Sequence, residues 1–104
     1  MSTSENLVCA ADIRAAGLTE WTLADGVLRA EYAVADFAAA LALANAVGAA
    51  AEEANHHPDL HVAWGRLGVD LTSHDAGGLT ARDVALARTV TALAAQHGAE
   101  AAGA

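Results

Sequence analysis

Apolar and polar residues alternate in the first third of the chain in the way that predicts a β-hairpin. Every second residue from Leu28 to Val34 is apolar, and Arg29 and Glu31 occupy the opposite face. The shorter apolar segment Trp21–Leu23 precedes this strand. The pair Asp25-Gly26 lies between the two segments and favours a tight turn, because Gly accepts a positive φ angle at little cost.

Two more short strands are predicted in the second half of the chain. They are Leu60–Trp64 and Leu67–Thr72, joined through Gly65-Arg66. In the second strand the apolar side chains share one face and Asp70 lies on the other. The same alternation places His74 with the polar residues.

Between the two strand pairs, apolar residues recur with helical spacing. This pattern predicts a helix from Phe37 to about Asn55, with Asp36 as its N-cap. Pro58 cannot continue the helix, and His57 before it is pushed towards extended backbone. The helix is therefore expected to end at the paired histidines.

Two further helices are expected near the ends of the chain. Cys9–Ala16 predicts a short helix that ends at Gly17. The segment Thr80–Asp83 has the form of a capping box and opens a last helix that ends at Gly98. The termini, including the Ala/Gly-rich tail 99–104, are expected to fray.

The element order is therefore α-β-β-α-β-β-α, with antiparallel pairing of the strands. This order predicts one α+β domain, residues 1–104, with the helices packed on one face of the sheet. Hydrophobic residues make up 55% of the chain and aromatic residues only 4%, so the core should be thin and mostly aliphatic.

Charge and composition exclude several classes of function. The chain has a net charge of -8 and its only basic residues besides histidine are five arginines, so it should repel nucleic-acid phosphates and anionic membranes. The longest apolar stretch, Phe37–Ala51, is interrupted by Asn45 and Gly48, and no signal peptide is visible. Cys9 is the single cysteine, which excludes an internal disulfide. A cytoplasmic location without nucleic-acid or membrane partners is expected.

Residues suited to proton transfer gather between Glu52 and Asp83. They are three histidines, two carboxylates and an aromatic ring: Glu52, His56, His57, Trp64, His74 and Asp83. Such a set is what an acid/base site without a metal needs. Glu52 and His56 are four residues apart, so they are expected to lie on one helical face, where the carboxylate and the helix C-terminus would both favour a protonated ring. His57 lies just past the helix end, and His74 could form a third wall.

Each of these residues also has a simpler structural explanation. His56 can be a helix-capping cation, Glu52 a solvated carboxylate and Trp64 a core residue, and Asp83 completes the capping box. Zinc binding by His56, His57 and His61 is disfavoured, because adjacent histidines chelate poorly and the spacing fits no familiar zinc motif. Only the joint spacing of the residues makes a site credible.

Read in order, Glu52, His56-His57-Pro58, Trp64, His74 and Asp83 resemble the signature of the pterin-4a-carbinolamine dehydratase family. The resemblance covers about residues 18–97 and includes the segments 51–59 and 72–83. It implies a four-stranded antiparallel sheet and assembly into homodimers or homotetramers. The implied reaction removes water from 4a-hydroxytetrahydropterin to give quinonoid dihydropterin, which recycles the cofactor of aromatic amino-acid hydroxylases. No metal or organic cofactor is implied.

The resemblance also assigns roles to residues. His56, His57 and His74 would be catalytic, Glu52 and Asp83 would support them, and Pro58, Trp64 and Ser73 would bind substrate. One hypothesis is that His57 or His74 protonates the departing hydroxyl while His56, steered by Glu52, handles a proton on a ring nitrogen. Leu60 and His61 depart from common family choices. The alternative is a non-catalytic relative, a binding or assembly factor that acts through its dimer surface.

Overall fold

The computed structural model describes residues 7–102, apart from the side chain of His74. The elements in chain order are α1 (Ala10–Ala15), β1 (Thr22–Ala24), β2 (Val27–Ala33), α2 (Phe37–Ala54), β3 (Asp59–Ala63), β4 (Arg66–Leu71), the 3-10 turn η1 (His74–Ala76), α3 (Ala81–Gln96) and β5 (Glu100–Ala101). The outermost ends that were expected to fray, residues 1–6 and 103–104, lie outside the described residues.

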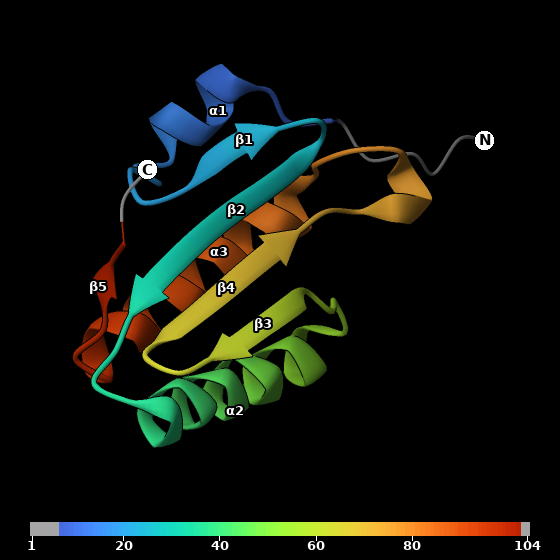
Figure 1. The fold of residues 1–104 in the computed structure, drawn as a ribbon. Coiled ribbons are helices and arrows are strands. Elements are labelled where there is room, and N and C mark those ends of the chain that lie inside the picture. The colour runs from blue at the N-terminus through green and yellow to red at the C-terminus, as the bar shows by residue number, and fades with distance from the viewer. Residues whose placement is uncertain (1–6, 103–104) are drawn as a thin grey trace.

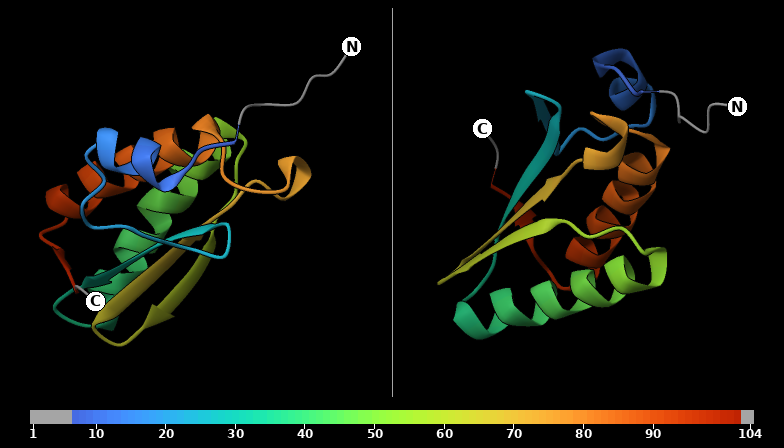
Figure 2. Two further views of the ribbon diagram at one scale, coloured as in Figure 1. Left: turned by 90° about the horizontal axis from the view of Figure 1, so that it is seen from above. Right: turned by 90° about the vertical axis from the view of Figure 1, so that its right-hand side faces the viewer.

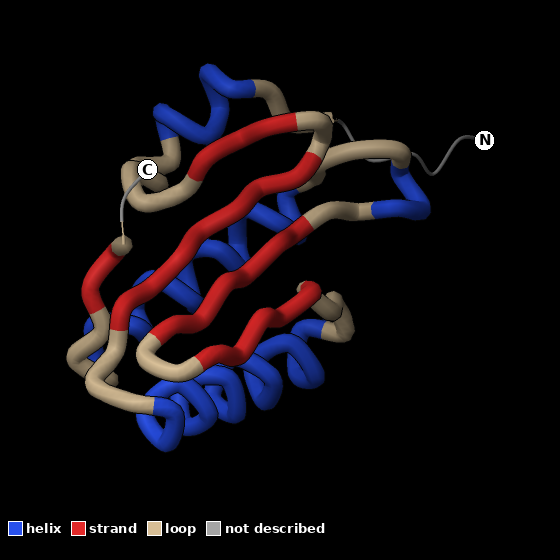
Figure 3. The backbone as a smooth tube through the Cα atoms, viewed as in Figure 1, coloured by secondary structure: helices blue, strands red, loops and turns tan. Residues whose placement is uncertain are grey.

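The four main strands form an antiparallel sheet in the order β1-β2-β4-β3, as Figures 1 and 3 show. The three α-helices lie on one side of this sheet, and the other face is open (Figure 2). The predicted α+β class and its one-sided layering are confirmed. The alternation in β2 and β4 explains the layering, because the apolar set of each strand faces the helices and the polar set faces outward.

The fifth strand corrects one prediction about the C-terminal tail. Residues Glu100 and Ala101 pair with Ala33 and Tyr32 of β2, and the backbone N–H of Ala102 donates to the carbonyl of Glu31 at 2.7 Å. The tail could not be read as a strand from an Ala/Gly-rich sequence, because its pairing depends on backbone groups that β1 leaves open along β2.

The turn chemistry follows the sequence closely. Asp25 and Gly26 both have positive φ angles, 54° and 74°, which is the backbone that a two-residue hairpin between β1 and β2 requires.

Helix α2 ends one residue earlier than predicted, and this difference shapes the site. Asp36 caps its start by accepting from the backbone N–H of Ala39 at 2.8 Å. At the other end Asn55 adopts a left-handed conformation with a φ of 52°. The backbone N–H groups of Asn55 and His56 then donate to the carbonyls of Glu52 and Ala51, the double closure of a Schellman motif. His56 therefore lies beyond the helix and not in its last turn.

By length and composition alone, α2 is also apolar enough to cross a membrane. Its inner face packs into the domain through Ala40, Leu43, Ala44, Val47 and Ala51. Both of its ends are closed by polar caps. In this fold α2 is a core helix that covers the sheet beside α3.

The hydrophobic core lies between the sheet and the helices. Its fully buried large side chains are mostly aliphatic: Leu28, Tyr32, Leu43, Val47, Leu67, Val69, Leu71 and Val90. The same buried set includes Ser73, Thr80 and Asp83, which are polar. Burying polar side chains in so thin a core is costly unless they are hydrogen-bonded to one another.

Candidate active site

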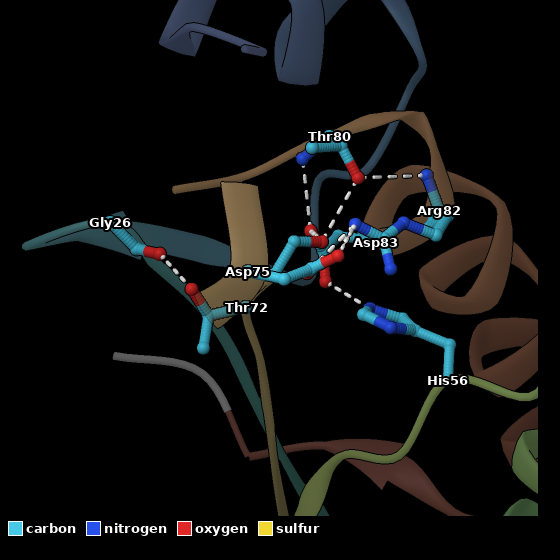
Figure 4. Close-up of polar contacts among 8 residues, drawn as sticks. Gly26, His56, Thr72, Asp75, Thr80, Arg82 and Asp83 are labelled. Carbon is cyan, nitrogen blue, oxygen red and sulfur yellow. Dashed lines mark hydrogen bonds and ion pairs between the residues drawn. The ribbon is translucent and has the colours of Figure 1, made fainter. Parts of the chain in front are cut away.

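A buried histidine and a buried aspartate meet where the loop after α2 approaches the start of α3. His56 is 7% exposed and Asp83 is fully buried. Their side chains are joined by a 2.6 Å contact between His56 Nε2 and Asp83 Oδ1 (Figure 4). The residues are 27 positions apart in the sequence, and the fold brings them together.

Asp83 uses both of its carboxylate oxygens. Oδ2 accepts from the hydroxyl of Ser73 at 2.6 Å and from the backbone N–H of Thr80 at 2.9 Å. The second contact confirms the capping box that the sequence predicted. Asp83 does more than cap the helix, since its Oδ1 is directed to His56.

The loop from Ser73 to Gly78 closes on itself and brings Ser73 to the start of α3. Ser73 and Gly78 form an isolated antiparallel bridge, and the hydroxyl oxygens of Ser73 and Thr80 lie 2.9 Å apart. Sequence reasoning treated Thr80 only as a cap and missed this contact. The bridge depends on how the loop folds, and no residue pattern in the sequence predicts it.

Glu52 contacts His57 instead of His56. Its Oε2 lies 2.5 Å from His57 Nε2, and both side chains are largely exposed, 76% for Glu52 and 55% for His57. The predicted Glu52–His56 pair is therefore wrong. Its premise was helical spacing through His56, and the left-handed Asn55 breaks that spacing and turns the His56 side chain inward.

His74 begins the turn η1, directly after Ser73. Its side chain lies outside the described part of the structure, so its predicted catalytic role stays a prediction. The next residue, Asp75, is held to Arg82 of α3 by two contacts of 2.9 and 3.1 Å. The hydrogen bond from Arg82 lowers the pKa of Asp75. This ion pair ties η1 to the same end of α3 that carries Asp83 (Figure 4).

The predicted substrate-binding residues lie in three different settings. Pro58 is half-buried between His57 and the start of β3. Ser73 is buried, with 1% of its surface exposed. Trp64 follows the other end of β3 from Pro58. The five residues of β3 span roughly 17 Å at 3.3 Å per residue, and Trp64 is 74% exposed. The interpretation of Trp64 as a core residue is wrong, and within one chain the structure does not bring it to His56.

A pocket of about 360 Å³ borders His56 between α2 and α3. It is lined by Ala50, Glu53, Ala54, His56, Arg82, Ala85, Leu86 and Thr89. Its volume falls at the lower end of the usual range for small-molecule sites, about 300 to 1,000 Å³. A larger hollow of about 730 Å³ lies on the open sheet face, away from His56, and includes His61.

The histidines considered for zinc occupy separate surroundings. His61 is exposed on β3 and lies against Gly68 of β4, on the outer face of the sheet. Within residues 7–102, excluding the His74 side chain, no three His, Cys, Asp or Glu side chains are placed to share a metal ion.

With this geometry established, comparison with known proteins identifies the family. Residues 7–93 match the family model for pterin 4 alpha carbinolamine dehydratase. The chain belongs to this family. A protein of Solibacter usitatus named "Putative pterin-4-alpha-carbinolamine dehydratase" is 47% identical over 75 residues, which are 72% of this chain and 79% of that protein. A protein of Thermosynechococcus vestitus with the same name is 41% identical over 86 residues, 81% of this chain and 90% of that protein.

Solved structures support the fold of this dehydratase family member. A Brucella melitensis protein described as a transcriptional coactivator/pterin dehydratase matches with a TM-score of 0.78 and 27% sequence identity, covering 86% of this chain and 99% of that chain. A second structure, described as a pterin dehydratase-like protein and RuBisCO assembly factor, matches with a TM-score of 0.58 over 71% of this chain and 86% of that chain. At 24% identity the second likeness concerns the fold alone.

Proposed function

We propose that this protein dehydrates 4a-hydroxytetrahydropterin to quinonoid dihydropterin by histidine acid/base catalysis. The observation that carries the proposal is the buried contact between His56 and Asp83, 2.6 Å long, in a chain that belongs to the dehydratase family. A histidine held by a buried carboxylate is a common arrangement for a group that transfers protons.

The reaction needs two coordinated proton transfers. One proton is delivered to the hydroxyl group as its C–O bond breaks, so that the oxygen leaves as water. A second proton is removed from a ring nitrogen, whose electrons form the new C=N bond. The two transfers add and remove one proton each, so the net change is the loss of one water molecule.

The two histidine pairs suit these tasks in different ways. His56 is buried, faces the pocket between α2 and α3, and is oriented by Asp83. In this proposal it removes the nitrogen proton, with Asp83 in the orienting role first assigned to Glu52. His57 is exposed beside Glu52, and either it or His74 protonates the departing hydroxyl.

A binding or assembly role without catalysis is the second candidate. It is favoured by an exposed apolar group at one end of the molecule, where Trp64 is 74%, Phe37 47% and Leu41 44% exposed. The Trp64-Gly65 turn is held to the loop between β2 and α2, because the Val34 N–H donates to the Gly65 carbonyl at 3.0 Å. Exposed apolar groups of this kind often contact other proteins.

Stopped-flow dehydration of freshly prepared 4a-hydroxytetrahydropterin separates the two candidates. The wild type should exceed the buffer rate, and His56→Ala should lose about 10²- to 10⁴-fold in rate. His61→Ala is the matched control, because it removes a histidine from the outer sheet face and should leave the rate unchanged. A wild type no faster than buffer would leave the non-catalytic candidate.

A further inference from the structure

Ser73 is built into the interior beside the candidate site and does not face it. Its side chain is 1% exposed, and its two polar neighbours, Thr80 and Asp83, are both fully buried. A hydroxyl with so little exposed surface cannot meet a substrate directly. The predicted role of Ser73 in substrate binding therefore needs a different physical basis.

The directions of the hydrogen bonds follow from the hydrogens available. A carboxylate can only accept, so the Ser73 hydroxyl donates its single hydrogen to Asp83 Oδ2 at 2.6 Å. Ser73 must then accept from the Thr80 hydroxyl, 2.9 Å away, and Thr80 Oγ1 accepts from the backbone N–H of Arg82 at 3.3 Å. The hydrogen bonds thus run from the backbone N–H of Arg82 through the hydroxyls of Thr80 and Ser73 to the carboxylate of Asp83.

The same reasoning fixes the imidazole of His56. Asp83 Oδ1 lies 2.6 Å from Nε2 and can only accept, so Nε2 carries a hydrogen. When a neutral imidazole holds its hydrogen on Nε2, Nδ1 is the ring atom that accepts a proton.

We propose that Ser73 is a positioning residue for the dehydration. By holding Oδ2 it keeps Oδ1 aimed at His56 Nε2, which reserves Nδ1 for proton transfer with the substrate. This inference rests on the proposed function. Removing the hydroxyl takes away the shorter of the two contacts at Oδ2, and the carboxylate can then rotate away from the ring.

The test combines stopped-flow kinetics with nitrogen NMR of the His56 ring in the full chain. Ser73→Ala should lower kcat about tenfold, the lower end of what a hydrogen bond to a charged group contributes. KM should change by less than about twofold, because Ser73 does not touch the substrate. The ring spectrum should change from one Nε2–H tautomer to a mixture.

Two further variants control for folding and for the loss of any hydroxyl. Thr72→Ala removes the neighbouring hydroxyl, which donates to the Gly26 carbonyl at 2.8 Å and lies outside the Asp83 cluster (Figure 4). It should keep the wild-type kcat and ring spectrum. Ser73→Cys nearly preserves side-chain volume but donates weakly, so its kcat should fall between those of the wild type and Ser73→Ala.

Two results would overturn the inference: a Ser73→Ala protein with wild-type kcat and ring spectrum, or one in which only KM changes. If the wild type shows no dehydration, the proposed function fails separately. In that case the nitrogen NMR spectrum of the His56 ring alone tests whether Ser73 orients Asp83. An unchanged His56 tautomer in Ser73→Ala rejects the positioning role.

Discussion

Two adjacent histidines in this protein each contact a carboxylate at nearly the same distance, yet their surroundings are opposite. His56 and Asp83 are 7% and 0% exposed, whereas His57 and Glu52 are 55% and 76% exposed. Water screens the outer pair and competes for its hydrogen bonds, so that pair contributes little to stability. In the inner pair the fully buried Asp83 has no exposed surface at which water could replace a lost partner, so breaking that pair is costly. Similar contact lengths therefore do not mean similar roles.

The largest effect should come from breaking the inner pair. Asp83→Ala leaves the imidazole of His56, the hydroxyl of Ser73 and the N–H of Thr80 without their acceptor, and should lower the free energy of unfolding by about 3 to 5 kcal/mol. Urea unfolding followed by circular dichroism measures this change. A loss below about 1 kcal/mol would mean that the buried cluster is not stabilised through Asp83.

The next effect should come from the residue that separates the two histidines. Asn55 has a φ of 52°, where a β-branched residue is strongly disfavoured. Asn55→Val should lower the free energy of unfolding by about 1 to 2 kcal/mol, whereas Asn55→Gly should match or exceed the wild type. Thermal unfolding of the wild type and both variants measures these differences in stability. Equal stability of the two variants would show that position 55 does not require a left-handed backbone.

The outer pair should be nearly silent in the same experiment. Glu52→Ala should change the free energy of unfolding by less than about 1 kcal/mol, because both partners are largely exposed. The difference from wild type should shrink further in about 0.5 M salt, where the screening length is only a few ångströms. A larger change that survives added salt would contradict the distinction between the two pairs.

The smallest effect should come from the ion pair that ties η1 to α3. Arg82 lowers the pKa of Asp75, so this pair stabilises the fold above the unfolded-state pKa and the stabilisation is lost as pH falls through the lowered folded-state pKa. Asp75→Asn should therefore be slightly less stable than wild type at pH 7, and the gap should be smaller near pH 3. Unfolding midpoints at both pH values measure the difference, and a gap that widens in acid would have the wrong sign.

The fold could be predicted largely from the sequence, because its determinants are local. The alternation in β2 and β4, the Asp25-Gly26 turn and the capping box at Thr80 each specify their own element. Strand β5 has no such signal and depends on pairing with β2.

The candidate site could be predicted as a set of residues but not as a set of contacts. One left-handed residue, Asn55, decides which histidine turns inward, and the sequence alone does not show which residue before Pro58 adopts that conformation. The partner of His56 lies 27 positions away, so no helical spacing could reveal it. Ser73 and Thr80 meet only because the loop between them closes.

The central claim is that dehydration depends on the orientation of His56 by Asp83 far more than on the contact of Glu52 with His57. One stopped-flow series with freshly prepared 4a-hydroxytetrahydropterin, comparing wild type, Asp83→Asn and Glu52→Gln, tests it most directly. Asp83→Asn should lose at least about 100-fold in kcat, while Glu52→Gln should stay within about tenfold of wild type. A Glu52→Gln protein as impaired as Asp83→Asn, or a wild type no faster than buffer, would contradict the claim.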